Sequence, residues 1–262
     1  MPKKLNTRGQ VTIYIIIAII LIAVVALFFV FRSQLGGILG GEEKNPDEFL
    51  SGCLEERIND VVIELGHQGG SLNPTVYKNF KFEDENKAYK ISYLCYNVNN
   101  YLPCVNQQPN LVGHVADEIK TELGNEIESC FTKLKKSYTD AGYEKTETGE
   151  NTYEIKVTDG KIIINYNQKL QFTKGETTKS FNNLNAQIKN NIYEFLSVTN
   201  RIVNDEATNC EFDVPKFIIN NPGKNIGSVK TQDGSTIYTI NNRGVGGIFR
   251  FAVKGGGCLR LE

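Results

Sequence analysis

The 262-residue chain has no tryptophan, a single methionine and only two histidines, His67 and His114. Two histidines leave almost no material for a multi-histidine zinc site, a haem-binding pair or an HExxH metalloprotease motif. No two cysteines have the CxxC spacing of a zinc or redox site, and no serine stands in a GxSxG nucleophile elbow. The sequence therefore predicts no catalytic residue, no metal and no cofactor.

Charge and proline are absent from residues 11–31, an unbroken apolar run that reads VTIYIIIAIILIAVVALFFVF. At about 1.5 Å of rise per residue, this run would form a helix of roughly 31 Å, which matches the hydrocarbon core of a bilayer. Lys3, Lys4 and Arg8 precede the run, so the positive-inside rule predicts a cytoplasmic N-terminus. The run is longer than the apolar part of a signal peptide, and no small-x-small cleavage site closes it. We expect a single-pass transmembrane helix in the cell membrane.

The remainder of the chain is expected to lie outside the cell. Residues 1–10 form the basic N-terminus or leader, residues 32–45 a glycine-rich neck, and residues 46–262 an extracellular region with an optional boundary near residue 142. Setting aside the four basic residues that flank the run leaves 25 Lys or Arg against 30 Asp or Glu. This mildly acidic balance argues against nucleic acid as a partner.

Sequence periodicity predicts an α+β fold for the extracellular region. Apolar residues recur at three- and four-residue spacing in three segments, which predicts three long helices: 46–65, 111–138 and 178–205. Gly66 is expected to end the first helix. Period-two alternation around Asp159-Gly160 predicts a β-hairpin, and further strands are expected at 76–82, 87–98 and from 210 onward. Helices and hairpins come in blocks, which is typical of largely antiparallel sheets.

All six cysteines follow the apolar run, and an even number of cysteines outside the cell favours two or three disulfide bonds. The candidates are Cys53, Cys95, Cys104, Cys130, Cys210 and Cys258. Six cysteines allow 15 connectivities, and their spacing does not choose among them. For Cys53 and Cys130, which fall on apolar helix faces, buried free thiols are the alternative.

The segment Arg8-Gly9-Gln10-Val11-Thr12 resembles the leader of archaeal type IV pilins, the class III signal peptide. In that family a prepilin peptidase cuts after the glycine, and the glutamine opens the mature apolar helix. The resemblance implies cleavage between Gly9 and Gln10. Pilins of this group usually carry a glutamate at the fifth mature position, where this chain has Tyr14, and this departure favours an uncleaved anchor.

Three segments carry a second resemblance: RGQVTIYIII, FLSGCLEERINDVVIELGHQGG and ISYLCYNVNNYLPC. Together they look like a family of membrane-anchored proteins from small-genome archaea of the DPANN group. The resemblance implies an archaeal cell-surface protein and no particular activity.

These observations predict a non-enzymatic surface protein for adhesion, protein interaction or surface structure. Amide- and Tyr-rich loops such as Asn97–Tyr101 suit contacts with a protein or glycan, and homo-oligomers are left open as partners. His67 is expected to satisfy local backbone groups or to be exposed, and His114 to pair with Glu118 at i,i+4. One alternative is a pilin-like filament subunit. Another is an exported glycan or peptide hydrolase, which would need a cleft lined by perturbed carboxylates or by His67.

Overall fold

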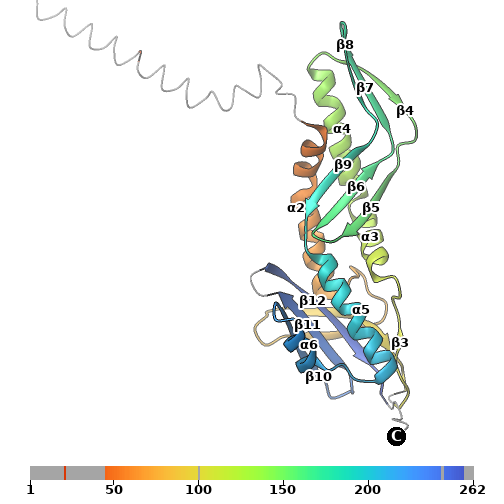
Figure 1. Cartoon of the computed structure of the whole chain (residues 1–262), viewed down its shortest axis with the longest axis vertical. Helices are drawn as coiled ribbons and strands as arrows, with labels where there is room; N and C mark the ends of the chain where they lie inside the picture. The colour runs from red at the N-terminus through yellow and green to blue at the C-terminus, as the bar shows by residue number, and fades with distance from the viewer. Residues whose placement is uncertain (1–20, 22–44, 100, 243–244, 257–262) are drawn as a thin grey trace, which may run out of the picture. The chain divides into compact units, whose positions relative to one another are not determined.

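The computed structural model describes Leu21 and residues 45–99, 101–242 and 245–256 (Figure 1). From Pro46 onward the chain forms one unit, separate from residues 1–45. None of the described helices is long and apolar enough to cross a membrane. The run at 11–31, for which a transmembrane helix was expected, lies outside the described residues except for Leu21.

The fold is α+β, but the prediction of three long helices is wrong. Five helices are described beyond Asn45: α2 (Pro46–Gln68), α3 (Leu111–Glu122), α4 (Gly124–Asp140), α5 (Ile192–Asn209) and α6 (Val214–Asn220). The predicted helix at 111–138 is two helices, because the chain leaves the helical conformation at Leu123 (φ −103°, ψ 14°), before Gly124. Glycine favours such an interruption because it loses the most backbone entropy in a helix.

The predicted helix at 178–205 is half wrong. Residues 177–189 form two strands, and the helix begins only at Ile192. Phe181, Leu184, Ile188 and Ile192 fit helical spacing, but Leu184, Ala186 and Ile188 are buried at every second position, as in a strand. A strand was also expected from residue 210, but this part of the chain leads into helix α6, which ends at Asn220. The Asp213 carboxylate caps the start of α6 by accepting a hydrogen bond from the Lys216 N–H at 2.9 Å.

Six strands form a long antiparallel meander next to α2, α3 and α4 (Figure 1). They are β4 (Glu144–Thr148), β5 (Tyr153–Thr158), β6 (Lys161–Tyr166), β7 (Lys169–Lys174), β8 (Thr177–Phe181) and β9 (Leu184–Lys189). Their orders, β4-β7-β8 and β5-β6-β9, show one three-stranded ribbon interrupted at the same level in each strand. The predicted hairpin is confirmed: Thr158 pairs with Lys161, and Gly160 has a φ of +72° in the turn.

Helix α2 covers the free edge of β9 with polar side chains. The Asn185 N–H donates to the Asp47 carboxylate, and the Gln187 N–H donates to the Ser51 hydroxyl, both at 2.9 Å. One residue past the strand, the Asn190 side-chain amide donates to Asn59 at 2.9 Å. The first two bonds satisfy backbone N–H groups that would otherwise belong to an exposed sheet edge.

A second sheet lies at the other end of α2. Its strands are β1 (Tyr77–Lys81), β2 (Ala88–Tyr96), β3 (Val105–Asn106), β10 (Lys224–Lys230), β11 (Thr236–Asn242) and β12 (Val245–Lys254). The order is β1-β2-β12-β11-β10, with β3 also paired to β2, and only β2 and β12 are parallel. The last half of α2 and helix α5 contact β12.

The end of α2 differs from the sequence expectation for a physical reason. The helix runs past Gly66 to Gln68, and Gly69, with a φ of +75°, follows it. A Cβ atom on Gly66 would stand only 2.3 Å from the carbonyl oxygen of Ile248 on β12. Gly66 therefore allows the helix to approach the strand, and Gly69 supplies the left-handed turn that ends it.

Candidate functional site

Two disulfide bonds join the predicted cysteines. Cys53 on α2 bonds Cys130 on α4 across 77 residues, and Cys95 on β2 bonds Cys104 just before β3 across nine. The free-thiol alternative for Cys53 and Cys130 is therefore wrong. Cys210 is also disulfide-bonded. Cys258 lies outside the described residues, as do Gly9 and Gln10 of the expected leader junction.

The bond between Cys95 and Cys104 closes a short loop. We call residues 97–105, which include Val105 at the start of β3, the disulfide loop; position 100 is not described. The Asn97 side chain donates to the Pro103 carbonyl at 2.9 Å, and the Leu102 carbonyl accepts from the Gly256 N–H at 2.9 Å. Despite this bracing, the loop leaves large apolar side chains in solvent: Val98 (71% exposed), Tyr101 (70%), Val105 (62%) and Leu102 (41%). These four side chains lie within eight residues of the sequence, and exposed apolar side chains that gather on a surface are typical of interaction sites.

His67, in the last turn of α2, contacts a buried cation from β12. The Arg250 guanidinium donates through Nη1 to His67 Nδ1 at 3.1 Å, and through Nη2 to the Glu85 carboxylate. The His67 ring stacks on Tyr89, with centroids 4.6 Å apart. Arg250 itself is only 5% exposed and lies 3.8 Å from the centroid of the Phe82 ring. This arrangement fastens the turn of the β1–β2 hairpin to the end of α2.

The electrostatics of this cluster follow from its contacts. The hydrogen bond from Arg250 lowers the pKa of Glu85 to about 2, although partial burial opposes the shift. Burial lowers the pKa of His67, and the positive charge of Arg250 lowers it further. His67 is therefore neutral at pH 7. Because its Nδ1 accepts from Arg250, its proton is on Nε2.

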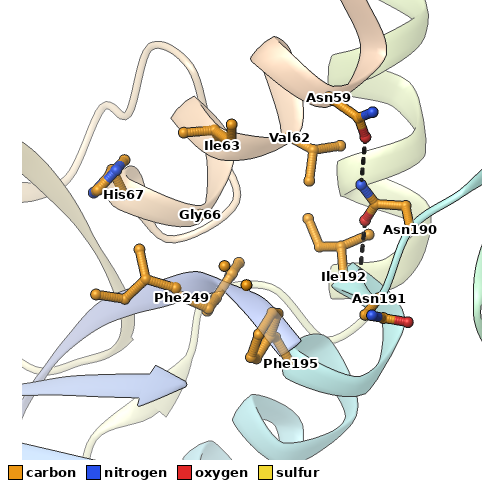
Figure 2. A pocket seen from close by; sticks show the side chains of 13 residues that line it. Asn59, Val62, Ile63, Gly66, His67, Asn190, Asn191, Ile192, Phe195 and Phe249 are labelled. Carbon is orange, nitrogen blue, oxygen red and sulfur yellow. Dashed lines mark hydrogen bonds between the residues drawn. The ribbon is translucent and has the colours of Figure 1, made fainter. Parts of the chain in front are cut away.

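A hollow of about 600 Å³ opens beside His67, between α2, the start of α5 and β12 (Figure 2). We call it the α2–β12 hollow. Its apolar lining is Val62, Ile63, Ile192, Phe195, Ile248 and Phe249. Asn59, His67, Asn190 and Asn191 supply polar atoms, and none of the described lining residues is an acid, a lysine or an arginine. Concave, mostly apolar sites of this size are typical of small-molecule binding.

A separate groove of about 1280 Å³ lies between the end of α5, the start of α6 and the strands β10 and β11. Glu206 lines it, and burial raises the pKa of this carboxyl even though it accepts a hydrogen bond from the Tyr238 hydroxyl. A carboxyl group with a raised pKa is a candidate general acid. No pattern in the sequence distinguishes Glu206, because it is one of many acids spaced along helices.

His114 makes the expected contact and an unexpected one. Its Nε2 lies 3.6 Å from Glu118, the i,i+4 partner, and 2.7 Å from the Ser71 hydroxyl. A catalytic triad needs the carboxylate at the other ring nitrogen, where it would orient the base. Here both partners meet Nε2. The trio therefore ties the loop after Gly70 to α3, an interpretation supported by the Leu72 N–H donating to Glu118 at 3.2 Å.

The described residues include no cluster of three or more His, Cys, Asp or Glu side chains that could hold a metal ion. No family model, no curated protein and no solved structure matches the chain.

Proposed function

We propose that this chain is a non-enzymatic protein of the cell surface. In this proposal the apolar run at 11–31 attaches it to the membrane, residues 46–262 face the exterior, and the disulfide loop binds another protein of the cell envelope. One observation carries the proposal: three large apolar side chains within the loop closed by Cys95 and Cys104, and Val105 directly after it, are exposed to solvent.

The chemistry of the loop supports a binding role. Aliphatic and tyrosine side chains give large contact areas, and such residues commonly dominate the energy of protein interfaces. The disulfide and the bonds to Pro103 and Gly256 restrict the loop before any partner arrives, which lowers the entropy cost of binding. Disulfide bonds persist mainly in oxidising compartments, so they also support an exterior location.

Binding to intact cells tests the proposal. Full-length chain in lipid nanodiscs should bind saturably to cells of the producing organism. Replacing Val98 and Val105 with serine should weaken binding at least about tenfold, because each side chain is worth on the order of 1 kcal/mol in an interface. The matched control is Ile219→Ser on α6, where the side chain is 79% exposed but distant in sequence from the loop. Equal binding by the loop variant and the control would refute the role of the loop.

Location needs its own measurement. Protease added to intact cells should digest residues 46–262, while a cytoplasmic marker protein stays whole. A folded region that is degraded only after the cells are lysed would rule out the exterior placement.

An exported hydrolase is the second candidate, and Glu206 is the observation that favours it. A protonated carboxyl beside a large groove could donate a proton to a leaving group, as glycan hydrolysis requires. The hydrogen bond that Glu206 accepts from the Tyr238 hydroxyl would have to break before Glu206 could contact a substrate. Hydrolysis of cell-wall glycans by the full chain that disappears in Glu206→Gln and persists in Glu211→Gln would establish this alternative.

A further inference from the structure

The α2–β12 hollow is shaped by two glycines. Gly66 admits the Ile248 carbonyl, and Gly247, with a φ of +112°, would place a Cβ atom 3.2 Å from the Phe195 ring. A side chain at either position would disturb the contacts between α2, α5 and β12 that form the walls. The hollow is therefore formed by the packing of α2, α5 and β12 against one another. Figure 2 shows Ile63, Phe195 and Phe249 around it.

The lining favours an apolar body without charge. Ile63 is 56% exposed although it belongs to a concave surface, so a bound molecule would remove a large apolar side chain from water. A neighbouring polar hollow of about 450 Å³ shares Ile63 and His67 with the first. The charged residues in its described lining are two acids and two lysines, which offset each other formally: Asp60, Glu64, Lys87 and Lys90. Neither hollow selects an anion or a cation.

The polar atoms of the hollow include donors that have no acceptor among the residues that the structure describes. Asn59 uses its side-chain oxygen to accept from Asn190, so its amide N–H groups remain, and within the described part of the chain they meet no acceptor. His67 accepts through Nδ1 from Arg250, and its Nε2–H likewise has no acceptor among the described residues. A ligand that fits these donors brings an oxygen that accepts hydrogen bonds.

We propose that the α2–β12 hollow binds a small uncharged molecule with an aliphatic or aromatic body and a carbonyl or hydroxyl oxygen. The body lies against Ile63, Phe195 and Phe249, and the oxygen accepts from His67 Nε2 or from the Asn59 amide. Arg250 acts as a positioning residue, since it fixes which nitrogen of His67 carries the proton. This site is distinct from the disulfide loop and does not depend on it.

Benzophenone is a suitable probe, because it is an uncharged aromatic ketone that forms covalent adducts with nearby C–H bonds under ultraviolet light. Full-length chain in lipid nanodiscs is irradiated with benzophenone at about 0.1–1 mM, the affinity expected for a ligand of this size. Peptide mapping should place adducts on residues 59–67 and 192–195. Adducts on residues 11–31, from benzophenone dissolved in lipid, serve as the loading reference. Adducts confined to other peptides would overturn the proposal.

Competition tests the chemistry of the ligand. 2-Octanone should suppress the adducts at least about tenfold more effectively than octanoate or octylammonium at equal free concentration, because neither hollow offers net charge to an ion. Equal suppression by all three compounds would show that the site does not select an uncharged ligand.

Variants test the location. Ile63→Trp should fill part of the hollow and reduce the adducts at least about fivefold, whereas Ile219→Trp, an exposed position outside the hollow, should leave them unchanged. Asn59→Leu and His67→Phe each remove one of the two alternative donors, so each should weaken labelling about twofold, and the double variant about fivefold to tenfold. Asn59→Leu leaves Arg250 untouched, so it remains informative if His67→Phe misfolds. Undiminished labelling in both Ile63→Trp and Asn59→Leu would refute the site.

Discussion

Replacing Glu85 with glutamine should loosen the β1–β2 hairpin more than removing its entire ion pair does. Arg250 is 5% exposed, and Glu85 is its only anionic partner among the described residues. In Glu85→Gln the guanidinium would stay buried beside neutral groups, with its Nε already lacking an acceptor. Breaking a fully buried pair costs about 3–5 kcal/mol. Because the Glu85 side chain is 24% exposed, we expect about 2–3 kcal/mol.

The double variant Glu85→Gln, Arg250→Met provides the contrast. Methionine can occupy the space between the Phe82 and Tyr89 rings, and no buried charge is left behind. Replacing a buried ion pair by apolar groups is often close to neutral. We expect a loss below about 1.5 kcal/mol, smaller than that of the single variant.

Hydrogen exchange of the full-length chain, followed by mass spectrometry, measures the opening of the hairpin locally. A loss of 2–3 kcal/mol should accelerate exchange of the amides in residues 77–96 by about 30- to 150-fold. The amides of β5 and β6 serve as the internal control. The reasoning is refuted if Glu85→Gln exchanges like the unmodified protein, or if the double variant exchanges as fast as the single one.

The same comparison has a pH dependence with a defined sign. The pKa of Glu85 is lowered from its ordinary 4.5 to about 2 in the folded protein. Its contribution to stability is therefore complete above pH 4.5 and is lost as the pH falls towards 2. After correction for intrinsic exchange rates, the difference between the unmodified protein and Glu85→Gln should shrink over this interval.

Three further predictions concern other parts of the chain. Gly66→Ala should destabilise the fold by more than about 3 kcal/mol, because its Cβ atom would meet the carbonyl of a strand residue. Gly52→Ala on the same helix, where a Cβ atom would meet nothing within 4 Å, should stabilise the fold by about 0.5–1 kcal/mol. Thermal unfolding followed by circular dichroism measures both changes. Replacing Cys95 and Cys104 with serine should cost about 2–3 kcal/mol in the same assay, and no loss would contradict the constraint we assign to the loop. Mass spectrometry of the native protein should find its first residue before Gln10, and a chain beginning at Gln10 would support the filament alternative.

Sequence reasoning succeeded where a local signal had only one structural solution. The Asp159-Gly160 pair predicted its hairpin because few other residues fit a tight turn with a positive φ. The cysteine count predicted disulfide bonds, two of which have both partners described. Their connectivity could not be predicted, because it depends on α2 meeting α4 in three dimensions.

Sequence reasoning failed where the spacing of apolar residues fits both a helix and a strand. The spacing of Leu184, Ile188 and Ile192 is compatible with a helix, and the alternate burial that identifies β9 appears only once its neighbours are known. The sequence predicts a helix end at Gly66, because glycine often has that role. The requirement for glycine at this position comes instead from a strand that begins about 180 residues later in the chain.

The candidate site could hardly be predicted from the sequence, because it too depends on contacts between segments that are far apart in the chain. His67 stood out as one of two histidines, but the chain gives no indication that Arg250 would fix its proton. The hollow beside it draws its walls from three separate segments. The apolar residues that line it follow the same patterns as those of the core.

The way α2 covers β9 has a consequence for the order in which the chain is made. Asp47, Ser51 and Asn59 are synthesised more than 130 residues before the strand and amide that they bond. The segment that forms α2 has therefore already been made when the β9 segment is synthesised, so the edge of β9 can pair within its own chain. A fragment that begins after α2 would expose backbone N–H groups of β9 that could pair with other copies, so we expect it to aggregate while longer chains fold.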